Sequence, residues 1–209
     1  MQLYVFPPSP NSLCCQATAN QAGIELELIP VDLSAGAHMD PEFIKINPNH
    51  KIPTLVDGDF SLWESGAIML YLAQQAPASK QIPDDPKEKA QMAQWLFWKT
   101  AHFGPACGIF TFENIVKGMF GMGDADPAQL EKGNEEFSRY AGVLNEHLQG
   151  RDFIVGDSVT LADHSVATWL VHAEAAGIPL ADYGELARWC KGVLGSDAWQ
   201  KALATIPTG

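Results

Sequence analysis

The chain has 209 residues and a formal net charge of −12, because 25 Asp and Glu outnumber 13 Lys and Arg. A hydrophobic content of 46% is sufficient to bury a core in one or two compact domains. The negative charge repels phosphate backbones and anionic lipids, which argues against nucleic acid and membrane surfaces as partners.

The N-terminal sequence lacks the basic region and long apolar stretch of an export signal, and no apolar run approaches membrane-spanning length. The cysteines are Cys14, Cys15, Cys107 and Cys190, a spacing that fits neither a disulfide framework nor a metal site. The scattered histidines form no metal-binding pair either. These features predict a cytoplasmic protein without a metal.

The chain opens with a predicted β-α-β unit. Residues 3–6 are a strand candidate, residues 12–21 a helix candidate that ends at Gly23, and residues 25–29 alternate as a half-buried strand does. We interpret Ser12 as the N-cap of the helix. A short helix through Ile46 should follow Asp40, because Asp is a favourable N-cap and Pro41 suits the first helical position.

Residues 47–68 are the most informative part of the chain. Residues 54–56 and 60–63 resemble short strands, and the dipeptide at Asp57-Gly58 or Gly58-Asp59 can close a tight hairpin between them. Glu64 and Ser65 then open an apolar helix. The predicted order of elements in this half is therefore β-α-β-α-β-β-α.

The same segment has the chemistry of an anchor for an amino acid. Pro53 has no N–H group, so the Ile52-Pro53 step leaves unpaired backbone groups next to a strand. The Ser65 hydroxyl and the amides of the first helical turn can hold a carboxylate. Glu64 offers a negative partner for an ammonium group, and a ligand with both groups is an amino acid.

The rest of the chain is predicted to be helical. Residues 76–86 contain three prolines and no apolar periodicity, which indicates a linker. Asp85-Pro86 and Asp126-Pro127 are helix starts, and no strand alternation follows Asp85. Thr160-x-x-Asp163 is a capping box, so we assign Asp163 a folding role. The next residue, His164, stands where a hydrophobic staple would have an aliphatic side chain.

The ordered string from Asn47 to Ile68 resembles the glutathione-binding segment of the cytosolic glutathione transferase superfamily, and the resemblance extends over the β-α-β-α-β-β-α half. It implies a thioredoxin-like glutathione-binding domain at 1–77, a linker at 78–86 and an all-α domain at 87–209. It also implies a cytoplasmic homodimer active in detoxification, which conjugates glutathione to a small hydrophobic electrophile. The partner subunit would cover the helices that follow Glu64 and Asp85.

The resemblance places the group that stabilises the glutathione thiolate in the loop after the first strand. Ser9 occupies the place of the serine in theta-like and phi-like members, whereas Asn11 corresponds to the asparagine of Nu-like bacterial members. Either residue could be the donor, and both are also ordinary turn residues. Tyr4 is better explained as a strand residue, and Cys14 and Cys15 lie inside the helix, which argues against a protein-cysteine mechanism.

The resemblance assigns the other contacts to glutathione as well. Ile52 and Pro53 would bind its cysteinyl backbone, and Glu64 and Ser65 its γ-glutamyl end. A basic side chain is expected at the glycine carboxylate, and the candidates are His38 and Lys51. His50 stands where the family often has glycine, and its role is open.

The second substrate is expected to meet the thiolate beside an apolar wall. Most aromatic residues at helical spacing belong to the core, so fewer than about half of the candidates should line this pocket. The candidates are Phe6, Trp98, His102, Phe103, Phe110, Phe112, Met119 and Phe120. A kinked helix is predicted at Phe103-Gly104-Pro105, followed by a mobile loop at residues 118–123.

Two further functions remain open from the sequence. Ser9-Pro10-Asn11 also favours a glutathione-dependent disulfide oxidoreductase of the Nu-like kind. A non-catalytic protein that binds glutathione or hydrophobic ligands would carry the same anchor.

Overall fold

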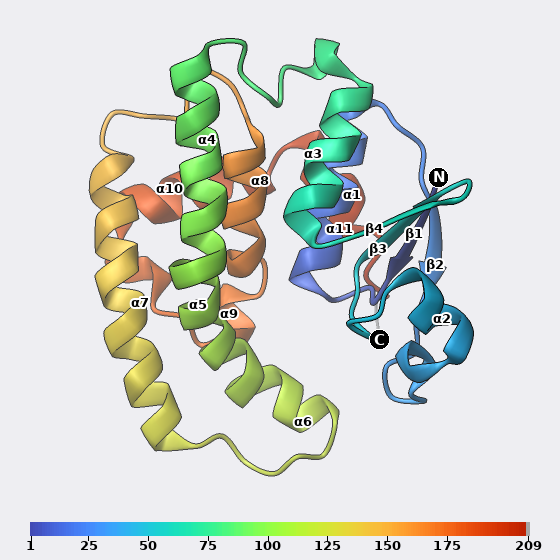
Figure 1. The fold of residues 1–209 in the computed structure, drawn as a ribbon. Coiled ribbons are helices and arrows are strands. Elements are labelled where there is room, and N and C mark those ends of the chain that lie inside the picture. Colours follow the sequence, from blue (N-terminus) through green and yellow to red (C-terminus); the bar gives the residue numbers. More distant parts are fainter. Residues whose placement is uncertain (208–209) are drawn as a thin grey trace. The chain divides into compact units, whose positions relative to one another are not determined.

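The fold is described from a computed structural model, in which residues 1–207 are placed well enough to describe (Figure 1). The chain forms two compact units. The first contains residues 1–82 together with the C-terminal segment from Gly195, and the second contains residues 83–194. No helix among the described residues is both long and apolar enough to cross a membrane.

The first unit is a four-stranded mixed sheet with helices. Its strand order is β2-β1-β3-β4, with β1 parallel to β2 and antiparallel to β3, and β3 antiparallel to β4. The order of elements confirms the predicted β-α-β-α-β-β-α arrangement. The elements are β1 (Gln2–Val5), α1 (Pro10–Ala22), β2 (Glu27–Pro30), α2 (Pro41–Ile46), β3 (Thr54–Asp57), β4 (Phe60–Trp63), α3 (Ser65–Gln75) and α11 (Asp197–Leu203).

Alternation along β1 explains how the sheet buries one face. Leu3 and Val5 are 0% and 2% exposed, whereas the residues between and before them are half-buried. Leu55 of β3 pairs with Leu3 across the antiparallel ladder and is equally buried. Because side chains alternate between the two faces of a strand, these residues form one apolar surface for the helices.

The prediction that Ser12 caps α1 is wrong. The helix begins at Pro10, and its N-cap is Ser9. Proline has a backbone angle suited to the first helical position, so the helix starts two residues earlier than predicted. Ser12 is fully buried, and its hydroxyl has no hydrogen-bond partner in the part of the chain that the structure describes. The predicted end is confirmed, since Gly23 is the C-cap with a φ of 69°.

The C-terminal helix α11 packs against α1 and not within the helical unit. The side-chain amide of Asn20 donates to the carbonyl of Ala198 at 2.9 Å, and the Thr205 hydroxyl donates to Gln16 Oε1 at 3.0 Å. Trp199 of α11 is fully buried. The compact units therefore differ from the sequence-based domains, which assign all residues after 86 to the helical domain.

The second unit contains only helices among its described residues, as predicted. Asp85 and Asp126 are confirmed as N-caps, because their carboxylates accept hydrogen bonds from first-turn amides at 2.9 Å. The helices are α4 (Pro86–Trp98), α5 (Gly104–Thr111), α6 (Lys117–Met119), α7 (Pro127–His147), α8 (Leu161–Ala167), α9 (Ala173–Ala176) and α10 (Gly184–Leu194).

Two π-helical turns join α4, α5 and α6 into one continuous coil. They span Lys99–Phe103 and Phe112–Val116. The first lies where the sequence predicts a kink, and it admits an extra residue without ending the helix. Gly104 follows it, and a Cβ atom there would lie 2.9 Å from Nε1 of Trp169. The close approach of Trp169 thus accounts for the glycine.

A buried carboxylate lies at the centre of the second unit. Asp163 accepts hydrogen bonds from the amide of Thr160 at 2.8 Å, the amide of Ile154 at 2.9 Å and Nε1 of Trp189 at 2.9 Å. Burial raises the pKa of Asp163, although these hydrogen bonds oppose the effect. The predicted capping box and its folding role are therefore explained by the contacts.

His164, the next residue, is fully buried in α8. Burial lowers its pKa to about 3, so the imidazole is neutral near pH 7. A neutral buried ring can replace the aliphatic side chain that the sequence pattern favours at this position.

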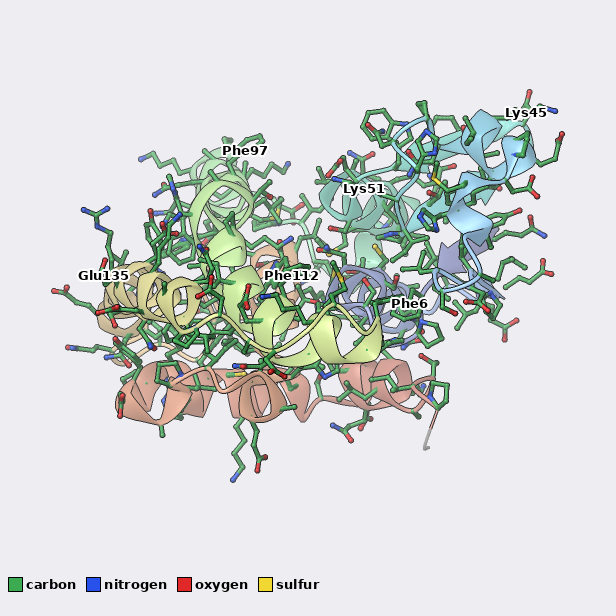
Figure 2. All side chains as sticks on the ribbon, turned by 90° about the horizontal axis from the view of Figure 1, so that it is seen from below. Phe6, Lys45, Lys51, Phe97, Phe112 and Glu135 are labelled. Carbon is green, nitrogen blue, oxygen red and sulfur yellow. The ribbon has the colours of Figure 1, made fainter. Side chains whose placement is uncertain are left out.

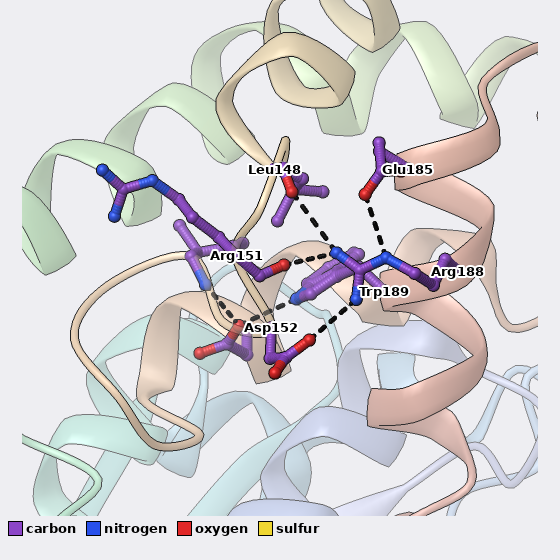
Figure 3. A network of polar contacts seen from close by, with 8 residues as sticks. Leu148, Arg151, Asp152, Glu185, Arg188 and Trp189 are labelled. Carbon is purple, nitrogen blue, oxygen red and sulfur yellow. Dashed lines mark hydrogen bonds and ion pairs between the residues drawn. The ribbon is translucent and has the colours of Figure 1, made fainter.

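Arg188 connects α10 to the loop between α7 and α8 (Figure 3). Its guanidinium pairs with Asp152 and Glu185, each at 2.9 Å, and also donates to the carbonyls of Leu148 and Arg151. The planar guanidinium suits several acceptors at once. The loop between α7 and α8 is thus bonded to two helices: Arg188 of α10 contacts residues 151 and 152, and Asp163 of α8 accepts from the Ile154 amide.

Candidate functional site

The loop after β1 is shaped by backbone hydrogen bonds. The Ser9 amide donates to the Phe6 carbonyl at 2.8 Å, and the Ser9 carbonyl accepts from the amides of Ser12 and Leu13. The Ser9 hydroxyl makes no cap hydrogen bond. It therefore stands at the N-terminus of a 13-residue helix, where the helix dipole favours a negatively charged group.

Asn11 and Ser65 are brought together although 54 positions separate them. The Ser65 hydroxyl donates to Asn11 Oδ1 at 3.3 Å. The buried thiol of Cys15 reinforces the junction, since it donates to the Ser65 carbonyl at 3.7 Å and to the Asn11 carbonyl at 3.4 Å. The structure thus joins a predicted thiolate donor to a predicted carboxylate-binding residue.

The start of α3 has an unusual backbone. Glu64 has a φ of 70°, in the left-handed region that few residues other than glycine adopt. Its side chain is exposed, whereas Ser65 is only 7% exposed. A non-glycine residue in this region is uncommon, and such strain is concentrated at functional sites. The geometry sets a carboxylate next to the amide donors of a helix N-terminus.

Asn47 organises the segment that leads into β3. Its side-chain amide donates to the Lys51 carbonyl at 2.7 Å and to Thr54 Oγ1 at 2.9 Å, and its oxygen accepts from the Asn49 amide at 3.0 Å. It is 1% exposed. In the sequence, Asn47-Pro48 has the character of an ordinary turn, so this positioning role of Asn47 was not predicted.

Between Lys51 and Thr54 the chain presents an unpaired backbone edge. The Ile52-Pro53 peptide bond is cis. Among residues 1–207, no backbone hydrogen bond involves Ile52, and β3 begins only at Thr54. An extended ligand could therefore pair with Ile52, in the way a peptide adds to a sheet edge.

The basic residues near this edge differ in their surroundings. Lys45 pairs with Glu42 at 2.5 Å, whereas exposed Lys51 forms no ion pair within residues 1–207 (Figure 2). His38 and His50 each have a buried Nδ1 atom with no hydrogen-bond partner in the described structure. Lys51 is thus a cation available to an anionic ligand, in a chain of strongly negative net charge.

Replacing Asn47 by alanine is expected to lower the free energy of unfolding by about 1–3 kcal/mol, because buried polar groups lose their partner. Urea unfolding followed by tryptophan fluorescence would measure the loss. Asn49→Ala is the matched control, since its exposed side chain makes one bond, to Asn47 at 3.1 Å. Equal stability of the two variants would contradict the role assigned to Asn47.

The predicted aromatic wall is divided between the core and the surface of the second unit. Phe103 and Phe110 are 0% and 2% exposed and contact Phe137, with ring centroids 5.8 and 6.1 Å apart. They offer no open surface to a ligand in this structure. His102 is exposed and stacks on Tyr140 at 5.2 Å.

The other members of the set are at least partly exposed. Phe112, Met119 and Phe120 are exposed, and Trp98 is half-buried against Trp95. Phe6 belongs to the first unit and is half-buried there. The most exposed aromatic residue of α4 was not predicted: Phe97 is 75% exposed and lies at the edge of its unit (Figure 2).

The cysteines are all buried and reduced. Cys14 and Cys15 lie inside α1, as predicted, and Cys14 donates to the Asn11 carbonyl at 3.3 Å. Burial raises the pKa of Cys107, and that of Cys190 to about 12. Such thiols are poor nucleophiles near neutral pH. Within residues 1–207, no three His, Cys, Asp or Glu side chains gather to hold a metal ion.

Comparison with known proteins agrees with this fold and site. The family models for the glutathione S-transferase N-terminal and C-terminal domains match residues 1–74 and 101–197. Glutathione S-transferase 3 of Zea mays is 33% identical over 99% of this chain and 95% of its own length. Glutathione S-transferase D7 of Drosophila melanogaster is also 33% identical, over 100% of this chain and 91% of its own.

A solved structure extends the comparison to a bound ligand. A glutathione transferase from Pseudomonas putida, with one glutathione disulfide bound per subunit, superposes with a TM-score of 0.87. It is 28% identical, with 99% of this chain and 91% of that chain covered. The chain therefore belongs to the cytosolic glutathione transferase superfamily, and its fold is the glutathione transferase fold.

Proposed function

We propose that the protein is a glutathione transferase that binds glutathione in its first unit and adds the thiolate to a hydrophobic electrophile. The observation that supports this most is the 3.3 Å hydrogen bond between Ser65 and Asn11. It links a carboxylate-binding helix start to the loop that carries the Ser9 hydroxyl. A ligand with a carboxylate at one end and a thiol further along fits this pair.

The roles of the residues follow from their chemistry. Ser65 and the first-turn amides of α3 hold the γ-glutamyl carboxylate, and Glu64 pairs with the ammonium group. Ile52 and Pro53 bind the cysteinyl backbone. Lys51 and His38 meet the glycine carboxylate, and the exposed Lys51 side chain gives the least specific of these contacts.

Ser9 or Asn11 donates a hydrogen bond to the sulfur, and the dipole of α1 adds to the stabilisation of the thiolate. The deprotonated thiol is the nucleophile, since the neutral thiol reacts poorly. The helical unit would supply the electrophile site, with half-buried Trp98 and exposed His102 as its candidates. A cytoplasmic homodimer completes the proposal.

A disulfide oxidoreductase is the second candidate. The Pseudomonas putida relative holds glutathione disulfide, and Ser9-Pro10-Asn11 suits this reaction equally well. A non-catalytic glutathione-binding protein is the third. Calorimetry with glutathione, followed by assays with an aryl halide and with a mixed glutathione disulfide, distinguishes all three. Binding without either activity would favour the third candidate, and no binding would contradict the proposal.

Ser9→Ala and Asn11→Ala should identify the donor. Loss of one hydrogen bond to a charged sulfur, at about 1.5–3 kcal/mol, raises the pKa of bound glutathione by about 1–2 units. Thiolate absorbance against pH measures this value. Ser12→Ala is the matched control, because its buried hydroxyl in the same helix has no partner in the described structure. If neither variant changes the pKa, neither residue is the donor.

A further inference from the structure

The loop between α7 and α8 lines an open cavity of about 470 Å³ within the second unit. The charged residues of its lining are Arg151, Asp152 and Asp157, and none of them belongs to the glutathione or electrophile site proposed above. We propose that this cavity binds the head group of an α-amino acid, with Arg151 on its carboxylate and Asp157 on its ammonium group. The inference is independent of the proposed function.

The loop has a defined conformation before any ligand binds. The guanidinium of Arg188 donates to the Asp152 carboxylate at 2.9 Å and to the Arg151 carbonyl, and the buried carboxylate of Asp163 accepts from the Ile154 amide at 2.9 Å. These contacts use the backbone and one carboxylate of the loop. A ligand therefore meets groups that are already in place, which reduces the entropic cost of binding.

Arg151 supplies the available positive charge of the cavity. Its guanidinium forms no ion pair or hydrogen bond within residues 1–207, and Figure 3 shows the side chain directed away from Arg188. Asp152 already pairs with Arg188, so it does not neutralise Arg151. A guanidinium can offer two parallel N–H donors to a carboxylate, which makes Arg151 the group that would hold an acid.

Available negative charge lies at residues 156 and 157 of the same loop. Asp157 is exposed, and its carboxylate has no partner in the part of the chain that the structure describes. Glu88 lies beside Gly156, because its Oε1 is 3.6 Å from the place that a Cβ atom would take there. These carboxylates repel a simple anion such as phosphate and attract an ammonium group. A ligand that carries both charges therefore suits the cavity better than either ion alone.

An α-amino acid head group carries both charges on one carbon atom. Free amino acids have this group, and so does the γ-glutamyl end of glutathione. Phe153 is half-buried in the lining and offers an apolar contact to the side chain of a free amino acid such as leucine. Because water reaches the charged contacts, the expected dissociation constant is about 1–10 mM.

NMR titration of the ¹⁵N-labelled protein tests the site, with the backbone amide signals of Gly150 and Gly156 as probes in the lining. L-leucine should shift both signals to saturation. Leucinamide lacks the carboxylate and N-acetylleucine lacks the ammonium group, so each should bind about tenfold more weakly, the usual value of one charge-assisted contact. S-methylglutathione is titrated in parallel, and the compound that saturates the shift at the lower concentration identifies the source of the head group.

Two variants match the two ends of the ligand. Arg151→Gln should weaken leucine binding about tenfold and leave leucinamide binding unchanged, whereas Asp157→Asn should weaken leucine binding and leave N-acetylleucine binding unchanged. Arg139→Gln and Glu135→Gln are the matched controls, because both residues are exposed on α7 outside the cavity. All four variants should keep the parent melting temperature, since the replaced side chains have no partner within residues 1–207.

Three results would overturn the proposal. The first is unshifted Gly150 and Gly156 signals at about 50 mM leucine, well above the expected dissociation constant. The second is equal binding of leucine, leucinamide and N-acetylleucine, which would mean that neither charge is recognised. The third is an equal loss of leucine binding in the control variants, which would mean that the net charge of the protein and not this cavity determines the response.

Discussion

Asp163→Ala is expected to lower the free energy of unfolding by about 3–5 kcal/mol, the largest loss we predict for a single substitution. The carboxylate is fully buried and accepts from Ile154, Thr160 and Trp189. Removing it leaves these donors without an acceptor in a place that water does not reach. The loop before α8, the helix itself and α10 lose their common contact.

Urea unfolding of the variant, followed by tryptophan fluorescence, should show this loss. Asp157→Ala is the control, because Asp157 is an exposed carboxylate in the same loop. Asp163→Asn, which keeps the shape and one acceptor oxygen, should fall between the two. A stability of Asp163→Ala within 1 kcal/mol of the control, roughly the value of one ordinary hydrogen bond, would contradict the assigned role.

Gly104→Ala should lower the free energy of unfolding by about 1–3 kcal/mol, the usual cost of forcing extra volume into a packed core. The added Cβ would lie 2.8 Å from the Lys99 carbonyl and 2.9 Å from Nε1 of Trp169. The carbonyl belongs to the π-helical turn and cannot retreat without disturbing it.

The control for this substitution is another helical glycine. A Cβ at Gly142 of α7 would meet no atom within 4 Å. Gly142→Ala should therefore stabilise the protein by about 0.5–1 kcal/mol, because alanine favours the helix. Opposite signs for the two variants in thermal unfolding would support the steric argument, and the same sign for both would refute it.

Local signals in the sequence predict the ends of several elements correctly. Asp40, Asp85 and Asp126 each precede a proline, and each caps the predicted helix. These motifs work because both the cap and the proline act within one helical turn. The predicted helix start at Glu64 and Ser65 is confirmed, because Glu64 is the N-cap of α3 and Ser65 its first residue. Their role in ligand binding stays a prediction.

Contacts between distant segments could not be predicted in this way. The bond between Asn11 and Ser65 depends on the packing of α1 against α3, which no local pattern encodes. The sequence predicts a kink beside the first π-helical turn but not the turn itself, because a π-helical turn differs from an α-helix by one inserted residue. Phe103 and Phe110 are a further example. Helical spacing predicts that both lie on an apolar face of their helix, but it does not tell whether that face belongs to the buried core or to a ligand pocket.

The packing of α11 on α1 has a consequence for the order in which the protein can be assembled. The first unit consists of two stretches of chain separated by the whole second unit, residues 83–194. Domains usually fold in sequence as they leave the ribosome, the N-terminal one first. Here the surface of α1 that receives Trp199 stays uncovered until the final helix has been synthesised. The unit that begins the chain is the last to be completed.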